Sequence, residues 1–140
     1  MGWVVFNFGE KMDKIKALNL NPVVLAFIGD AVYTLYVRER LIFSSDLKTG
    51  MLNKRAVAVV NAKAQSDFAK TLLSIFTEEE LSVFKRARNA KKPTKAKNAS
   101  VSDYNYATGL EAVLGYLYLI ADYNRLNFIL DKGMTNESWR

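Results

Sequence analysis

The feature that most restricts the fold of this chain is a run of apolar residues with a single carboxylate inside it. Residues 23–37 read VVLAFIGDAVYTLYV, and twelve of these fifteen residues are apolar or aromatic. Asn21 and Pro22 precede the run, and this pair is typical of the N-cap and first position of a helix. We therefore predict a helix over about residues 22–42. Because apolar residues cover nearly all of its surface, we expect this helix to be buried at the centre of the fold.

The rest of the chain also favours helices. The 140 residues include only seven glycines and two prolines, which are few helix breakers for this length. Apolar periodicity predicts further helices over about residues 10–18, 51–74, 102–121 and 123–131, and one that begins at the capping-box pair Thr77 and Glu80. No segment alternates as a strand does. We predict an all-α fold in a single domain over residues 1–140, with its core at about 20–130 and a tail at about 132–140.

Two carboxylates lie where the sequence predicts buried helices. Residues 107–121 read ATGLEAVLGYLYLIA, and Glu111 is the only charge among them, as Asp30 is within residues 23–37. A buried carboxylate is costly unless it is paired, and the adjacent helical turns offer neither acid a Lys or Arg. If the two helices pack together, Asp30 and Glu111 can face each other and hold a cation. Alternatively, each acid accepts a hydrogen bond from a buried hydroxyl, such as those of Tyr33, Tyr104 or Thr108.

The composition narrows the chemistry that these acids can perform. The chain contains no cysteine and no histidine, which excludes disulfides, zinc fingers, Cys nucleophiles and His general acid–base catalysis. Ligands that offer only oxygen select hard cations, so we expect Mg²⁺ at such a site, with Mn²⁺ as the alternative.

The positive charge of the chain is concentrated in one segment. Residues 85–97, KRARNAKKPTKAK, hold seven of the 20 basic residues and no acidic one, which leaves 13 basic and 14 acidic residues elsewhere. One interpretation is a solubilising surface loop, and the other is a patch that binds phosphates of a nucleic acid. The candidate contacts are Lys85, Arg86, Arg88, Asn89, Lys91, Lys92, Lys95 and Lys97, with help from Lys54, Arg55 and Lys63. Together with the two acids, this segment favours metal-dependent hydrolysis of a nucleic acid.

Several motifs resemble one known family. LAFIGDAVYTLYVRERLI (25–42) resembles the signature helix of the ribonuclease III family, and ATGLEAVLGYLYL (107–119) resembles its second acidic helix. KAQ (63–65), KRARNAK (85–91) and YNYATGLEA (104–112) resemble its compact branch, the Mini-ribonucleases III, which lack an appended double-stranded-RNA-binding domain. The combination is more specific than any one of these motifs.

The resemblance implies a helical-bundle endonuclease domain that acts as a homodimer and cleaves double-stranded RNA with Mg²⁺. It implies a role in maturation of the large-subunit (23S) ribosomal RNA precursor, with a ribosomal-protein helper as a further partner. By position, Asp30 and Glu111 match the catalytic metal ligands, and Phe27 matches a residue that packs across the dimer interface. Acids that larger relatives carry are replaced here by Val23, Ala26 and Thr108, which leaves a thinner ligand set.

We expect a cytoplasmic protein that does not enter a membrane. The most apolar stretches, at about residues 22–37 and 110–121, are shorter than a membrane span, and no basic region precedes the short apolar run at the N-terminus. Two other functions remain open at this point. One is a non-catalytic RNA-binding or ribosome-assembly module on the same fold, and the other is a structural helical adaptor.

Overall fold

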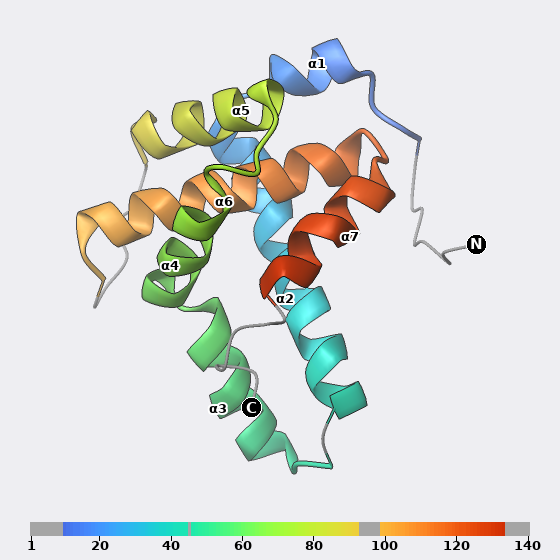
Figure 1. The fold of residues 1–140 in the computed structure, drawn as a ribbon, viewed down its shortest axis with the longest axis vertical. Helices are drawn as coiled ribbons and strands as arrows, with labels where there is room; N and C mark the ends of the chain where they lie inside the picture. The colour runs from blue at the N-terminus through green and yellow to red at the C-terminus, as the bar shows by residue number, and fades with distance from the viewer. Residues whose placement is uncertain (1–9, 45, 93–98, 134–140) are drawn as a thin grey trace.

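The computed structural model describes residues 10–44, 46–92 and 99–133, and within these ranges it is all-α (Figure 1). The helices are α1 (Lys14–Leu18), α2 (Pro22–Ser44), α3 (Thr49–Val60), α4 (Ala62–Leu72), α5 (Glu78–Asn89), α6 (Val101–Leu119) and α7 (Tyr123–Lys132). No strand is present in these ranges, so the predicted fold class is confirmed. No helix of the described ranges is long and apolar enough to cross a lipid bilayer.

The fold is organised around the crossing of α2 and α6 (Figure 1). Two glycines let the helices touch backbone to backbone. A Cβ atom at Gly29 would lie 1.7 Å from the carbonyl oxygen of Glu111, and one at Gly115 would lie 2.0 Å from that of Leu25. Any larger residue at these two positions would force the helices apart. The close crossing brings Asp30, the residue after Gly29, next to Glu111.

Helix α6 is the central helix of the domain. Ten of its 19 residues are buried, because α2, α4, α5 and α7 all pack against it. Gly109 belongs to this packing, since a Cβ there would lie 2.6 Å from the ring of Phe84. The largest side chains that are fully buried around α6 include Tyr116, Phe84, Leu25, Leu72, Leu110, Leu114 and Ile129.

Helix α2 is buried on one face only, so the expectation that it is buried all round is wrong. Gly29, Tyr33 and Val37 face the core. The opposite side exposes an apolar face, defined here as Val24, Phe27, Leu35, Ile42 and Phe43, and Phe27 is 81% exposed. A sequence pattern records that a residue is apolar, but it does not say whether the residue is covered by its own chain.

The single helix predicted over residues 51–74 is also wrong, because the chain breaks into α3 and α4 at Asn61. This residue has an extended backbone, with φ −67° and ψ 159°. Its side chain caps both helices: Oδ1 accepts a hydrogen bond from the Ala64 amide at 2.9 Å, and Nδ2 donates to the Val57 carbonyl at 2.9 Å. Asparagine competes with the helical ladder in this way, and the double cap stabilises the break.

The other predicted helix ends agree with the structure to within a few residues. Asn21 accepts a hydrogen bond from the Val23 amide at 2.9 Å at the start of α2. Both hydrogen bonds of the Thr77–Glu80 capping box are present. Helix α1 is shorter than predicted because Asp13 caps it and Lys14 is its first residue.

Candidate active site

The structure brings Asp30 and Glu111 together. Their side chains lie within interaction distance of each other at the α2–α6 crossing. Glu111 is half-buried and Asp30 is exposed, so the expectation of two buried acids is wrong for Asp30 and holds only in part for Glu111. Burial raises the pKa of Glu111 to about 9, and the neighbouring charge of Asp30 adds to this effect. A carboxyl group with such a pKa is held in a site that is unfavourable for its ionised form.

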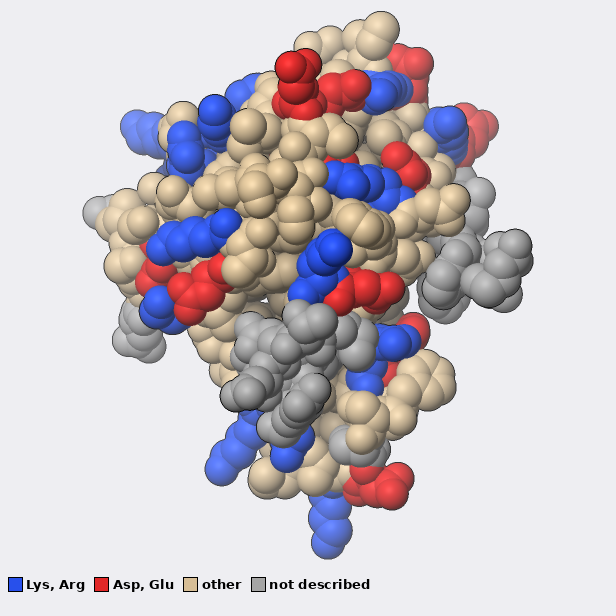
Figure 2. Space-filling view, viewed as in Figure 1, with Lys and Arg blue, Asp and Glu red and all other residues tan. Residues whose placement is uncertain are grey.

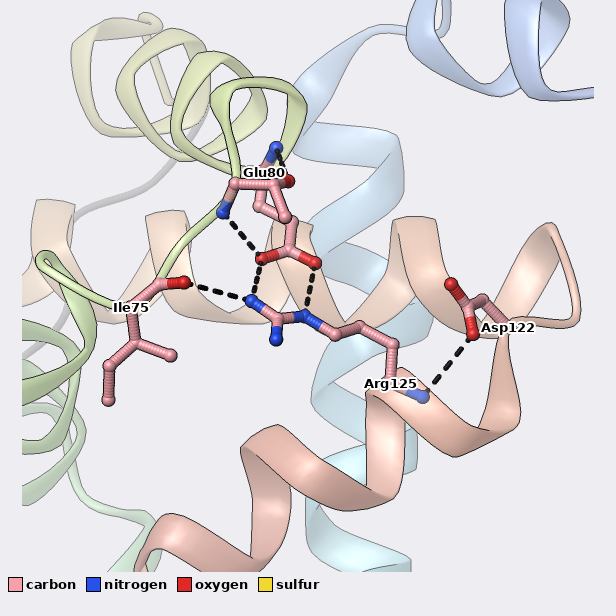
Figure 3. Close-up of polar contacts among 5 residues, drawn as sticks. Ile75, Glu80, Asp122 and Arg125 are labelled. Atoms are coloured by element: carbon pink, nitrogen blue, oxygen red, sulfur yellow. Dashed lines mark hydrogen bonds and ion pairs between the residues drawn. The ribbon is translucent and has the colours of Figure 1, made fainter.

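Neither acid has a cationic partner within ion-pair distance among the described residues. The contrast is Glu80, which is only 3% exposed (Figure 3). Its two carboxylate oxygens accept hydrogen bonds from the guanidinium of Arg125, both at 2.8 Å, and the same guanidinium donates to the Ile75 carbonyl at 2.9 Å. The fold therefore neutralises its structural buried acid with an arginine, but the described residues supply no such partner to the Asp30–Glu111 pair.

The donor set around this pair fits a hard cation. It consists of carboxylate oxygens from Asp30 and Glu111, with the amide of Gln65 beside them. The described residues contain no group of three or more His, Cys, Asp or Glu side chains that could hold a metal ion. Two carboxylates match the way proteins bind Mg²⁺, since this ion keeps several waters and takes its remaining ligands from substrate phosphate.

The positions at which larger relatives carry acids contribute no carboxylate here. Ala26 and Thr108 are buried near the crossing. The Thr108 hydroxyl donates to the Tyr104 carbonyl of its own helix at 2.8 Å, so this hydroxyl is occupied within α6.

Gln65 belongs to this site, although the sequence motifs alone do not assign it there. It is 3% exposed and lies close to the Glu111 carboxylate, where it lowers the pKa of Glu111 and partly offsets the effect of burial. The available signal is its spacing, because Gln65 shares one face of α4 with the buried residues Phe68, Ala69 and Leu72. A polar side chain on a buried face needs a partner, and here the partner is Glu111.

The basic residues expected to bind RNA are not all free to reach a ligand. Arg86 donates to the carbonyls of Leu18 and Leu20, at 2.6 and 3.2 Å, and so holds the α1–α2 connection. Lys63 is paired with Asp67 at 2.9 Å, and this hydrogen bond raises the pKa of Lys63.

The end of α5 carries the remaining basic candidates. Arg88 donates to the Asn89 side chain at 3.1 Å and lies over the ring of Tyr106 at 5.9 Å. Lys92 donates to the Arg88 carbonyl at 2.7 Å, while Lys85 and Lys91 are exposed. Lys95 and Lys97 lie outside the described residues.

The face drawn in Figure 2 carries basic and acidic side chains intermixed over its centre. Basic side chains project at its lower end, over α3, the helix that contains Lys54 and Arg55. Charge on this face is therefore divided between helices and does not form one continuous patch.

Phe27 and Asp30 are three residues apart on α2 and share one side of the helix. Both are exposed. The acid pair therefore lies at the border of the apolar face. Exposure of such an apolar surface to water is unfavourable, so a candidate catalytic group lies beside a candidate interaction surface.

The sequence of this chain is similar to those of known proteins of one family. Residues 23–122 match the family model described as "Ribonuclease III domain". A protein named Mini-ribonuclease 3 from Thermoanaerobacter sp. (strain X514) is 44% identical over 122 residues, which cover 87% of this chain and 86% of the relative. The Mini-ribonuclease 3 of Clostridium tetani is 46% identical over 123 residues, which cover 87% of this chain and 82% of the relative.

A solved structure has the same fold. It is the crystal structure of a protein from Fusobacterium nucleatum, with a TM-score of 0.80 and 32% sequence identity. The match covers 90% of this chain and 99% of that one, so the similarity extends over the whole helical bundle.

Proposed function

The chain belongs to the ribonuclease III family of RNA endonucleases, and we propose that it cleaves double-stranded RNA with Mg²⁺ held between Asp30 and Glu111. One observation carries the proposal: the side chains of these two acids lie against each other without a Lys or Arg partner among the described residues. Two adjacent carboxylates cannot both ionise easily unless a cation joins them. Mn²⁺ is the alternative ion, because it accepts the same oxygen ligands.

Asp30 and Glu111 would hold the cation from two different helices. The glycine contacts at the α2–α6 crossing fix the spacing of their backbones, so the ligands are preorganised by packing. Glu111 must release its proton when the cation binds, because a carboxylate ligand has to be ionised. When bound, Mg²⁺ supplies a water of lowered pKa as the nucleophile and stabilises the leaving oxygen of the phosphodiester.

We propose that the exposed basic side chains hold the RNA duplex through its phosphates. Lys85, Lys91 and Lys54 are exposed, and Lys92, Arg88 and Arg55 are half-buried. Duplex RNA is recognised mainly by its shape, through phosphates and 2′-hydroxyls, which suits lysines spread over several helices. Lys63, Arg86 and Asn89 remain candidates, although Arg86 already donates to two carbonyls.

We propose a homodimer in which the apolar face of α2, with Phe27 near the centre of the contact, packs against the same face of a second copy. A single apolar face used by both copies is the geometry of a two-fold interface. Because Asp30 lies on the same side of α2 as Phe27, such a dimer would place both acid pairs near the interface.

We further propose that the cellular substrate is the precursor of 23S ribosomal RNA, processed in the cytoplasm with a ribosomal-protein helper. The support is the resemblance to Mini-ribonucleases III, a branch associated with trimming this precursor, and the two relatives named Mini-ribonuclease 3. On this proposal residues 1–140 act as a single catalytic domain.

The proposed function is tested by incubating the protein with a long RNA duplex, with each separated strand and with a DNA duplex of the same sequence. We expect cleavage of the RNA duplex alone, with Mg²⁺ or Mn²⁺, and no cleavage with a chelator. Cleavage in chelator would contradict the metal requirement, and equal cleavage of single strands would contradict the substrate. Binding of the duplex without cleavage would favour the alternative, a non-catalytic RNA-binding or ribosome-assembly module.

A further inference from the structure

Gln65 occupies a position that packing alone does not explain. Its side chain is 3% exposed on the buried face of α4. The amide oxygen Oε1 is buried and has no hydrogen-bond partner in the described part of the chain. A buried acceptor without a donor destabilises the folded state, so an apolar residue of the same size would be more favourable in the core.

The orientation of the Gln65 amide is determined by the break at Asn61. In an unbroken helix the amide of Ala64 would donate to the Val60 carbonyl, but here it donates to the Asn61 side chain at 2.9 Å. The Val60 carbonyl instead accepts from Gln65 Nε2 at 2.6 Å. A carbonyl oxygen can only accept, so this contact requires Nε2, and not Oε1, to face Val60.

An amide nitrogen carries two hydrogens, and the second hydrogen of Gln65 Nε2 is left for Glu111. The Gln65 side chain lies close to the Glu111 carboxylate and lowers the pKa of Glu111, as a donor at this position would. The contacts therefore form a chain from the Val60 carbonyl through the Gln65 amide to the carboxylate of Glu111, which faces Asp30.

We propose that Gln65 is a positioning residue, anchored by the carbonyl that the Asn61 break releases, and that it orients the Glu111 carboxylate toward Asp30 for cation binding. This inference rests on the proposed function of the acid pair. On this proposal Gln65 contacts neither the RNA nor the reacting atoms. It acts through Glu111, as groups around metal ligands commonly do, and loss of such a group typically costs 10–100-fold in metal affinity or activity.

A positioning role for Gln65 predicts that its loss weakens cation binding, which a purely structural role does not predict. Gln65→Met keeps the length of the side chain and removes both donors. We expect the concentration of Mn²⁺ or Mg²⁺ that gives half of the thermal shift to rise about 10-fold, in protein without RNA. We expect kcat at subsaturating Mg²⁺ to fall by about the same factor, while KM for duplex RNA stays within about twofold of wild type, because RNA contacts are unchanged.

Gln65→Ala is the second variant, since it tests the same donors without any misfit of a longer side chain. Ser66→Ala is the matched control. Ser66 is the next residue on α4 and is fully buried, but its hydroxyl lies beside Asp103 and not beside the acid pair. Ser66→Ala should leave the metal dependence unchanged, whatever it does to the melting temperature.

Asp30→Asn separates failure of this inference from failure of the proposed function. If Asp30→Asn keeps the wild-type metal-induced thermal shift, or if wild type has none, the acid pair is not the cation site and the proposed function fails. If Asp30→Asn loses the shift while Gln65→Met and Gln65→Ala both keep wild-type midpoints and kcat, the site is correct and the role of Gln65 is overturned.

Discussion

Asp30 and Glu111 face each other where α2 crosses α6, and no basic side chain of the described residues neutralises them. Their proximity follows from Gly29, which lets the two helix backbones meet at this point. The same domain pairs its other buried acid, Glu80, with Arg125. An acid pair without a cationic partner lowers the free energy of unfolding. Such destabilisation is expected at a site that binds a cation.

The glycine at the crossing should be irreplaceable. We expect Gly29→Ala to lower the free energy of unfolding by about 3 kcal/mol, because its Cβ would lie 1.7 Å from a backbone oxygen that cannot move alone. Gly50→Ala in α3 is the matched control, since a Cβ there meets nothing within 4 Å. It should be neutral or stabilising by about 0.4–1 kcal/mol. Urea unfolding of both variants gives the comparison, and equal stability of the two would refute the close contact.

Replacing the titratable carboxyl group of Glu111 by a neutral amide should stabilise the protein when no cation is present. At pH 8 in chelator we expect Glu111→Gln to raise the free energy of unfolding by at least about 1 kcal/mol. The pKa of Glu111 is raised in the folded protein, from 4.5 to about 9. The folded state therefore retains a proton that the unfolded state releases, and stability falls as pH rises through this window. The gain from Glu111→Gln should accordingly shrink at pH 5.

Glu80→Gln provides the opposite result as a control. It removes the carboxylate that pairs with Arg125, so we expect the free energy of unfolding to fall by about 1.5–3 kcal/mol. Thermal unfolding in chelator measures both variants, and destabilisation by Glu111→Gln would contradict the account of the acid pair.

The apolar face of α2 should mediate self-association. We expect Phe27→Asp to convert a dimer into a monomer, because it places a charge at the centre of the proposed contact. Ile15→Asp is the matched control, because Ile15 is 69% exposed but belongs to a different helix, α1. Sedimentation velocity at micromolar concentration distinguishes the two states. A Phe27→Asp protein that remains dimeric, or a wild type that is monomeric throughout, would exclude this interface.

The affinity for duplex RNA should fall as the salt concentration rises, because the basic segment at residues 85–97 binds phosphates. We expect replacement of Lys91, Lys92, Lys95 and Lys97 by Gln to weaken binding and to reduce the slope of log affinity against log salt. The slope should fall by about 0.7–0.9 for each phosphate that the variant no longer neutralises. Replacement of Lys11 and Lys16 by Gln serves as a control of similar type near α1. Fluorescence anisotropy with a catalytically inactive variant gives the slopes, and an unchanged slope would remove this segment from the RNA interface.

Helix ends were predictable because their signals are local. The cap at Asn21 and the capping box of Thr77 and Glu80 depend on residues only two or three positions apart, and each forms as expected. The pairing of Asp30 with Glu111 was also predictable, since an uncompensated acid in each of two apolar helices leaves few other arrangements.

Features that depend on distant contacts were not predictable. The periodicity of residues 51–74 continues through Asn61, so the break is visible only in the hydrogen bonds that its side chain makes to both helices. The local pattern groups Gln65 with the polar positions of its helix, because its partner Glu111 lies on another helix. The exposed side of α2 around Phe27 could not be distinguished from a core face, since both are apolar.

The most direct test of the account is the rate at which Asp30→Asn cleaves a long RNA duplex under saturating Mg²⁺, measured beside wild type and Glu79→Gln. Glu79 is a solvent-accessible acid that pairs with Lys14 outside the site. We expect Asp30→Asn to lose more than about 100-fold in rate, which exceeds the loss typical of a residue that only supports a ligand, while it keeps its fold and its dimer. Glu79→Gln should retain activity. Cleavage by Asp30→Asn at the wild-type rate would contradict the assignment of the Asp30–Glu111 pair as the cation site.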